Sequence, residues 1–167
     1  SSPTRNKTMK DDDAKHLKSL IRHIDNVRAS CLLLGERLIE NGKDELGLQL
    51  IANGHIHDAS KFHGIEWEYL RDETKESHPI EFALALKHHQ HVNPHHPEYW
   101  TNGVKSMPSV YLAEMVCDWK ARSNEFATGL RSWIKQRATK RWNFTVQSKE
   151  YKLIKGFVDV LLDSEFK

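Results

Sequence analysis

The chain has 167 residues, of which 38% are hydrophobic and 29% are charged, and its formal net charge is only +2. This composition is that of one globular domain with a sizeable core, and it excludes a largely disordered chain. No apolar run approaches the roughly 20 residues that cross a bilayer, and no signal peptide is recognised. Cys31 and Cys117 both fall in apolar helical patterns, where reduced buried thiols are expected. A cytoplasmic protein without a membrane partner is therefore expected.

Apolar side chains recur at helical spacing along the whole chain, and no stretch alternates as a strand would. The first helix is expected to run from the Asp11–Asp13 cluster to Asn41-Gly42, because acids favour a helix start and Asn-Gly favours an end. Further helices are expected at about 44–60, 64–73, 77–91, 108–127, 130–140 and 148–164. The sequence thus predicts an all-α single domain, a bundle of about six to seven helices.

The expected division of the chain has three parts. Residues 1–10 are expected to be disordered or an addition to the natural sequence, and the helical domain is expected to span 11–167. Within this domain, residues 16–127 would form the core that carries the site. Residues 128–167 would add basic and aromatic helices.

Four polar residues fall where a buried site is expected. His23 lies on the apolar stripe of the first helix, between Leu20 and Val27, and His57 follows Leu50 by two helical turns. Asp58 sits beside His57, and an ionised Asp near a core is costly unless it is paired or metal-bound. Asp118 lies near the inner edge of the fifth helix. A single inward His is more often a hydrogen-bonded core residue, but two imidazoles with two carboxylates suit one octahedral Mn²⁺, Co²⁺, Ni²⁺, Mg²⁺ or Fe²⁺ ion.

The order His … His-Asp … Asp and the string "HDASK" resemble the HD-domain superfamily of metal-dependent phosphohydrolases. "HDASK" is similar to the HD step of its 5′-deoxynucleotidases and dNTP triphosphohydrolases, and to the His-Asp-x-x-Lys pattern of its cyclic-di-nucleotide phosphodiesterases. The resemblance spans residues 23–118 and implies metal ligands at His23, His57, Asp58 and Asp118. It also implies a phosphate contact at Lys61, a general acid at Glu66, and a nucleophile oriented by Asp118 or Asp58.

A second resemblance rests on "KHHQHVNPHHPEYW" and "MPSVYLAEMVCDWKARS", which are similar to strings of an uncharacterised family in bacteria and their phages. That family brings no activity, but it implies that the His cluster and Asp118 share one site.

The cluster "HHQHVNPHH" holds five of the 11 histidines within residues 88–96. One interpretation, taken from the two-metal members of the HD superfamily, is a second metal site with His88 or His89 as ligand. Another is a phosphate cradle with proton donors, because imidazole titrates near neutrality; its residues would be His89, Asn93, His95 and His96. A polar loop without such a role is the third possibility.

Charge is distributed unevenly. Residues 129–155 carry eight Lys or Arg and one acid, Glu150, with Trp133, Trp142, Phe144 and Tyr151 interleaved. This segment could bind nucleic acid or a phosphorylated substrate, or form a solvated helix face. Arg122 follows Asp118 by one helical turn, where it could clamp a phosphate or simply pair with a neighbouring acid.

These features favour a divalent-metal-dependent phosphohydrolase with one or two ions. Its substrate would be a phosphorylated small molecule, and the resemblance implies a nucleoside mono- or triphosphate. No glycine-rich phosphate loop is present, so a P-loop NTPase is not expected. Two alternatives stay open: a di-iron oxygenase on the same fold, and a nucleic-acid or nucleotide-binding module that uses residues 129–155. A homo-oligomer is compatible with the resemblance.

Overall fold

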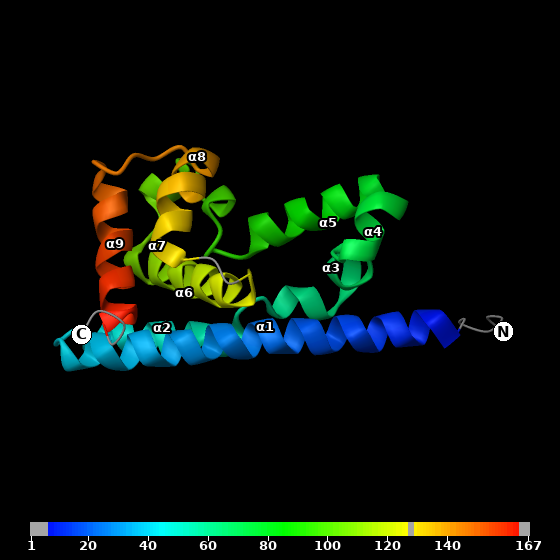
Figure 1. The fold of residues 1–167 in the computed structure, drawn as a ribbon, viewed down its shortest axis with the longest axis horizontal. Coiled ribbons are helices and arrows are strands. Elements are labelled where there is room, and N and C mark those ends of the chain that lie inside the picture. The colour runs from blue at the N-terminus through cyan, green and yellow to red at the C-terminus, as the bar shows by residue number, and fades with distance from the viewer. Residues whose placement is uncertain (1–6, 127–128, 164–167) are drawn as a thin grey trace.

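The fold is all-α, as the sequence predicts. The computed structural model describes residues 7–126 and 129–163, and these contain no strand. Its longer helices are α1 (Lys7–Glu40), α2 (Asp44–Ile56), α5 (Pro79–Val92), α6 (Ser109–Phe126) and α9 (Lys149–Leu161) (Figure 1). The first helix begins at Lys7, four residues before the expected start. Residues 1–6 and 164–167 lie outside the described residues. The prediction of disorder for residues 1–10 therefore falls mostly outside the described part of the chain.

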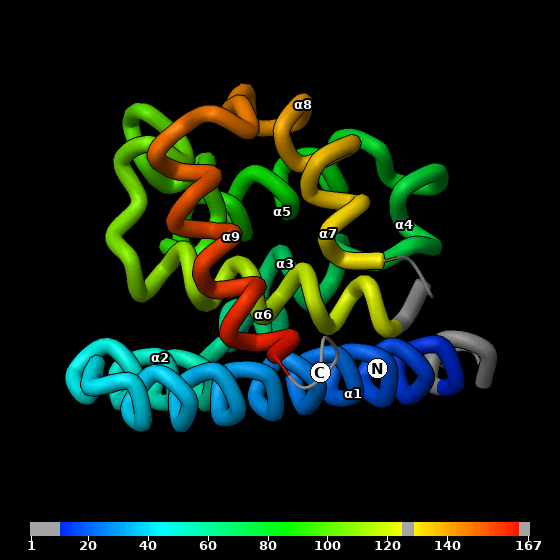
Figure 2. The backbone as a smooth tube through the Cα atoms, turned by 60° about the vertical axis from the view of Figure 1, so that its left-hand side comes forward, coloured from blue at the N-terminus to red at the C-terminus, as the bar shows by residue number. Residues whose placement is uncertain are grey.

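Helices α1 and α2 lie side by side along one side of the molecule, and the other helices lie across from them (Figure 2). The turn between them contains Gly42, whose φ of +82° is readily adopted only by glycine. The two helices approach closely at Gly35 and Gly47. A Cβ on Gly35 would lie 2.8 Å from the carbonyl oxygen of Gly47, so no larger residue fits without a shift.

The hydrophobic core lies where α1, α2, α6 and α9 meet. Most of the predicted inward stripe is buried, as at Val27, Leu50, Val116 and Ile154. Helical spacing also predicts Leu17 and Leu153 as inward residues, but this is wrong, because they lie at the edges of their stripes and are 38% and 39% exposed. Cys31 and Cys117 are both buried and free, as expected, and burial raises the pKa of the Cys117 thiol. Within the described ranges, no helix is both long and apolar enough to cross a membrane.

Two boundaries differ from the sequence prediction. Helix α2 ends at Ile56 and not near residue 60, because the backbone leaves the helical conformation at His57, with ψ of 128°, and is left-handed at Asp58, with φ of +56°. A short 3₁₀ turn, Ala59–Phe62, follows. The expected single helix at 64–73 is two short helices, α3 (Gly64–Tyr69) and α4 (Asp72–Ser77), separated by the extended residue Arg71.

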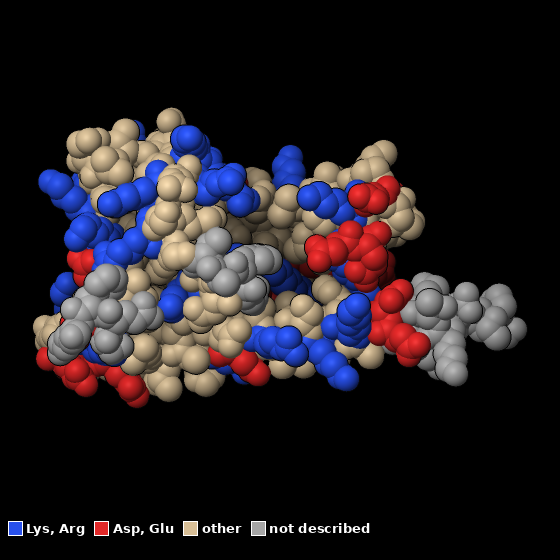
Figure 3. Space-filling model, viewed as in Figure 1, with Lys and Arg blue, Asp and Glu red and all other residues tan. Residues whose placement is uncertain are grey.

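The C-terminal part begins with α7 (Leu130–Trp133), a π-helical turn (Ile134–Ala138) and α8 (Thr139–Arg141), so the expected helix at 130–140 is continuous but irregular. Helix α9 follows, capped by the Ser148 hydroxyl, which accepts a hydrogen bond from the Tyr151 amide at 3.1 Å. Lys and Arg side chains spread over the region of α7 to α9, at the upper left of Figure 3.

Candidate metal centre

Three separate elements bring the four expected ligands together in the interior. His23 comes from α1, His57 and Asp58 follow the end of α2, and Asp118 comes from α6. The Nε2 atom of His23 lies 2.8 Å from Oδ1 of Asp118. The Nε2 atom of His57 lies 3.4 Å from Oδ2 of Asp58 and 3.8 Å from Oδ1 of Asp118. All four side chains are buried. These separations resemble the roughly 3 Å between adjacent donors on an octahedral ion with bonds of about 2.1 Å.

The backbone at Asp58 determines where its carboxylate points. Its left-handed conformation, φ +56° and ψ +25°, follows the end of α2 and turns the side chain into the interior. Asp and Asn tolerate this conformation better than most residues, because their short polar side chains can make local hydrogen bonds. The residue type that offers a metal-binding oxygen therefore also suits the turn that presents it.

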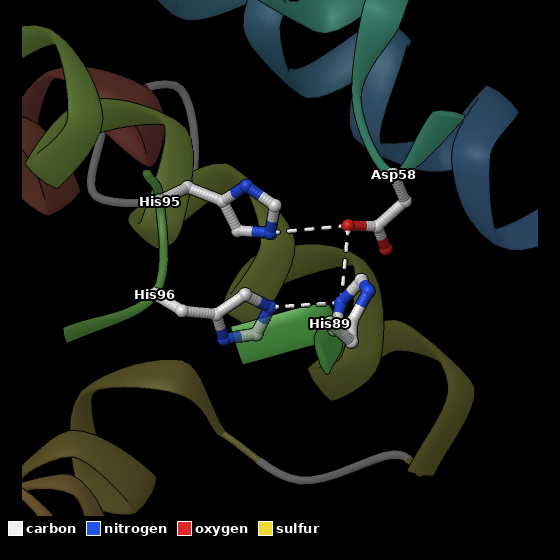
Figure 4. A group of neighbouring side chains, drawn as sticks. All are labelled: Asp58, His89, His95 and His96. Atoms are coloured by element: carbon white, nitrogen blue, oxygen red, sulfur yellow. Dashed lines mark hydrogen bonds and ion pairs between the residues drawn. The ribbon is translucent and has the colours of Figure 1, made fainter. Parts of the chain in front are cut away.

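Three histidines of the cluster extend the site on the other side of Asp58 (Figure 4). Oδ1 of Asp58 lies 3.2 Å from Nε2 of His95 and 3.3 Å from Nε2 of His89. Nε2 of His96 lies 3.0 Å from Nε2 of His89. The sequence interpretation assigned His95 and His96 to substrate binding, but the structure places both among the possible metal donors.

The donor atoms form overlapping groups in which all atoms lie within 4.8 Å of one another. The groups are His23, His57 and Asp58; His57, His95 and Asp118; and Asp58, His89, His95 and His96. Asp58 is a member of two of these groups, one with His23 and His57 and the other with His89, His95 and His96. The cluster could therefore hold one metal ion or two.

Of the two second-metal candidates, only His89 is brought into the cluster. The side chain of His88 is 47% exposed, and its Nδ1 lies 2.5 Å from Glu66 instead. The sequence could not decide between these neighbours. In the structure the two side chains point in different directions, because consecutive residues of an α-helix such as α5 are rotated by about 100° about its axis.

Two buried glutamates orient the histidine rings. Oε2 of Glu114 accepts from Nδ1 of His57 at 2.8 Å and lies 2.9 Å from Nδ1 of His95. Oε1 of Glu66 accepts from Nδ1 of His89 at 2.6 Å. A ring that donates from Nδ1 presents the lone pair of Nε2 to the cluster, which is the tautomer a metal requires.

The hydrogen bonding of four buried atoms indicates whether the cluster fits a cation. His57 Nε2, His95 Nε2 and both carboxylate oxygens of Asp58 form no hydrogen bond with the described residues. They make ion-pair contacts of 3.2–3.4 Å with one another and with Lys61. Buried polar atoms are nearly always hydrogen-bonded, because an unpaired one costs roughly 1–3 kcal/mol. Each of these atoms belongs to a residue of the overlapping donor groups, so one or two divalent cations in the cluster would satisfy them. The donor set therefore fits a metal ion.

The pKa values describe the electrostatics of the cluster without a metal. Burial acts to lower the pKa of His57, but the Asp58, Glu114 and Asp118 carboxylates outweigh it and raise that pKa well above its usual range. Burial acts to raise the pKa of Asp58, but His57, Lys61 and His95 hold it well below normal. The carboxylates thus stabilise positive charge at this position, whether it is carried by a proton or by a metal.

His96 behaves differently from the other rings. Burial, followed by the neighbouring His95 and His89, lowers the pKa of His96 to about 2. Its imidazole is therefore neutral near pH 7 and keeps a lone pair available for coordination.

A cavity of about 710 Å³ opens onto the cluster, in the size range of small-molecule sites. His23, His89, His95, His96 and Asp118 are part of its lining. Figure 3 shows the surface hollowed between the side of α5 and the side of α6 and α7.

Lys61 and Arg122, the two expected phosphate contacts, both line this cavity. Lys61 Nζ lies 3.2 Å from Oδ2 of Asp58, and Arg122 Nε lies 3.7 Å from Oδ1 of Asp118. Two other expected residues do not line it. Asn93 is buried and donates to the Ser60 hydroxyl and to the His89 carbonyl. The carboxylate of Glu66 is buried beneath the histidines.

Sequence reasoning missed Glu114 as a functional residue. A signal was present, because Glu114 precedes Asp118 by one helical turn and therefore lies on the same inward face of α6. It also missed that part of the basic segment lines the cavity, through Trp133, Arg141 and Trp142. That contact depends on how α7 and α8 fold back, which no local pattern specifies.

The fold and the site define an all-α protein with a buried histidine and carboxylate cluster that could hold a metal ion. The sequence profile of DUF5662, a family of unknown function, matches residues 12–163, and the chain belongs to that family. No curated protein and no solved structure matches the chain.

Proposed function

We propose that the protein is a divalent-metal-dependent phosphohydrolase that acts on a phosphorylated small molecule, with nucleoside phosphates as the expected substrates. The observation that carries this proposal is the charge around the cluster. The cavity is lined by five cationic side chains but only two acids, Asp72 and Asp118; the cations are Lys61, Arg71, Lys75, Arg122 and Arg141. Three of these cations are ion-paired, Lys61 with Asp58, Arg71 with Asp13 and Arg122 with Asp118. The excess positive charge therefore comes from Lys75 and Arg141. Excess positive charge next to a metal centre favours an anionic ligand. The HD-type order of ligands supports the same reaction class.

The metal would be held by His23, His57, Asp58 and Asp118, with His89, His95 and His96 available to a second ion. A bound divalent ion supplies a water of lowered pKa and polarises a phosphoryl oxygen. Lys61 approaches the cluster from the cavity side and would offset negative charge on the transferring phosphoryl group. Arg122 would bind a non-bridging oxygen, because its guanidinium lies at the edge of the same cavity.

Glu66 is better suited to positioning than to proton donation. Its oxygens accept hydrogen bonds from His88, His89 and Ser60, and its side chain does not contribute to the cavity lining. A general acid must come within about 3 Å of the leaving oxygen, directly or through one water. We therefore assign Glu66 to the orientation of His89, and we expect the leaving alkoxide to take its proton from solvent in the open cavity.

Phosphate release tests this proposal. The protein would be assayed with Mn²⁺ or Co²⁺ on nucleoside monophosphates, nucleoside triphosphates and cyclic dinucleotides; phosphodiester cleavage would be followed by chromatography. Asp58→Asn is the informative variant, because Asn keeps the left-handed backbone and removes the charge. Asp25→Asn, an exposed position on α1, is the matched control.

The proposal predicts metal-dependent turnover that persists in Asp25→Asn and falls by at least about a hundredfold in Asp58→Asn, because the metal water is no longer activated. Turnover of no phosphate ester by metal-loaded protein would refute it.

A di-iron oxygenase is the second candidate, and the number of donors favours it. Seven His and Asp side chains offer ligand atoms within the overlapping groups, which is enough for two irons. Oxygen consumption by iron-loaded protein in the presence of candidate organic substrates would distinguish the two. Hydrolysis by protein that carries Mn²⁺ alone, without oxygen, would exclude the oxygenase.

A further inference from the structure

Three tryptophans from two distant parts of the chain meet at one side of the cavity. Trp119 and Trp142 are stacked, with ring centroids 5.4 Å apart and an interplanar angle of 22°. Trp133 contacts both edge-on, at 5.2 Å from Trp119 and 6.3 Å from Trp142. All three are part of the cavity lining. Trp119 is buried in the hydrophobic core, whereas Trp133 and Trp142 pack against that core and are only half-buried. The accessible part of the aromatic group therefore comes from Trp133 and Trp142.

Arg141 adds a planar cation to this aromatic group. Its guanidinium carbon lies 4.5 Å from the centroid of the Trp142 ring, and the same residue lines the cavity. Arg141 is exposed and forms no ion pair with a described carboxylate, so its charge is available to a ligand. The indole of Trp142 is fixed by a hydrogen bond from Nε1 to Oε1 of Glu98 at 3.0 Å. Trp142 is stacked on Trp119 and covered by the Arg141 guanidinium. A planar ring could stack on the exposed guanidinium plane, and an anionic group could pair with its charge.

The aromatic group is continuous with the metal centre. Trp119 directly follows the candidate ligand Asp118, and Arg122 lies one helical turn further along α6 on the cavity side. One molecule could therefore place a phosphate at the cluster and a ring among the tryptophans. A cavity of about 710 Å³ has room for a ligand of that size.

We propose that Arg141, Trp133 and Trp142, supported from the core by Trp119, form a subsite for the planar aromatic ring of a phosphorylated substrate, such as the base of a nucleotide. This inference rests on the proposed function for the phosphate end of the substrate. It assigns a role to the aromatic C-terminal segment, for which the sequence left three possibilities open: nucleic-acid binding, contact with a phosphorylated substrate, and a solvated helix face. Stacking on an aromatic platform would favour a ring-bearing ligand by roughly ten- to a hundredfold.

The test separates the ring from the phosphate and uses metal-loaded protein. Calorimetry would measure the binding of adenosine, which carries the ring without a phosphate. Rate measurements would compare kcat/KM for adenosine 5′-monophosphate with that for ribose 5-phosphate. The variants are Trp133→Leu, in the aromatic group, and Arg141→Ala, an exposed position whose loss should not impair folding. Arg137→Ala is the control, because it removes an exposed charge from the same basic segment outside the cavity lining.

We expect adenosine to bind, and we expect Trp133→Leu and Arg141→Ala each to weaken that binding by about fivefold or more. Arg137→Ala should leave it unchanged. Adenosine binding without turnover of either phosphate ester would support the subsite and overturn the proposed function alone. Turnover of both esters with equal kcat/KM and no adenosine binding would overturn the subsite. An equal loss in Arg137→Ala and Arg141→Ala would also overturn it, because it would indicate attraction to the basic surface as a whole.

Discussion

Glu114 accepts a hydrogen bond from Nδ1 of His57 at 2.8 Å, and both side chains are buried. With Nδ1 donating to Glu114, Nε2 faces Asp58 and Asp118, and the neutral ring would present its lone pair there to a metal. The same oxygen of Glu114 lies 2.9 Å from Nδ1 of His95. One carboxylate therefore sets the orientation of two rings that come from different parts of the chain.

Replacement of Glu114 by Gln should weaken metal binding by roughly ten- to a hundredfold, because a neutral amide oxygen accepts more weakly than a carboxylate and no longer raises the basicity of the two imidazoles. Competition with a fluorescent chelator would measure the affinity for Mn²⁺ or Co²⁺. Glu36→Gln, an exposed substitution on α1, serves as the control and should leave the affinity unchanged. Equal affinities for Glu114→Gln and the native protein would show that Glu114 does not orient the ligands.

A second prediction separates the two roles considered for Glu66. If Glu66 orients His89, Glu66→Gln should lower metal affinity and should slow substrates with good and poor leaving groups alike. A general acid would act differently, because a leaving group such as p-nitrophenolate needs no proton. Rates on p-nitrophenyl phosphate and on a nucleoside monophosphate would be compared. A selective loss on the nucleotide, with metal affinity intact, would restore Glu66 as the acid.

Helical periodicity was enough to predict the long helices and most of the core. It placed His23, His57, Asp58 and Asp118 on inward faces, and the structure brings these four side chains together. The left-handed turn at Asp58 was not predicted, because a backbone reversal by one non-glycine residue leaves no periodic signal. The positions of His88 and His89 and the role of Glu114 depend on the rotation of α5 and α6 about their axes. Tertiary packing sets that rotation.

The close approach of α1 and α2 leads to a prediction about the free energy of unfolding. Gly35→Ala should destabilise the protein by about 1–3 kcal/mol, because its Cβ would lie 2.8 Å from the Gly47 carbonyl oxygen and the helices must separate. Gly156→Ala on α9 is the control, since a Cβ there meets nothing within 4 Å. That change should stabilise by about 0.4–1 kcal/mol. Urea denaturation would measure both. A Gly35→Ala protein as stable as the native one would contradict the packing described for these helices.

Metal should also stabilise the fold. Free metal at a hundred times its dissociation constant should raise the free energy of unfolding by about 2.7 kcal/mol, because the buried donors assemble only in the folded chain. Thermal unfolding with and without Mn²⁺ would detect this as a rise in Tm. Asp58→Asn should remove most of this rise. It should also lower Tm in the absence of metal, because His57, Lys61 and His95 hold the pKa of Asp58 well below its usual range, so the ionised carboxylate stabilises the fold near pH 7. A rise of the same size in Asp58→Asn would place the bound metal elsewhere.

The most direct test is the metal content of the protein. Elemental analysis after equilibrium dialysis against Mn²⁺ or Fe²⁺ would give ions per chain for the native protein and for Asp58→Asn. Because Asp58 joins the donor groups on its two sides, we expect two ions in the native protein and a loss at both positions in the variant. No ion bound by the native protein, or equal content in the two proteins, would contradict the assignment of this cluster as a metal centre.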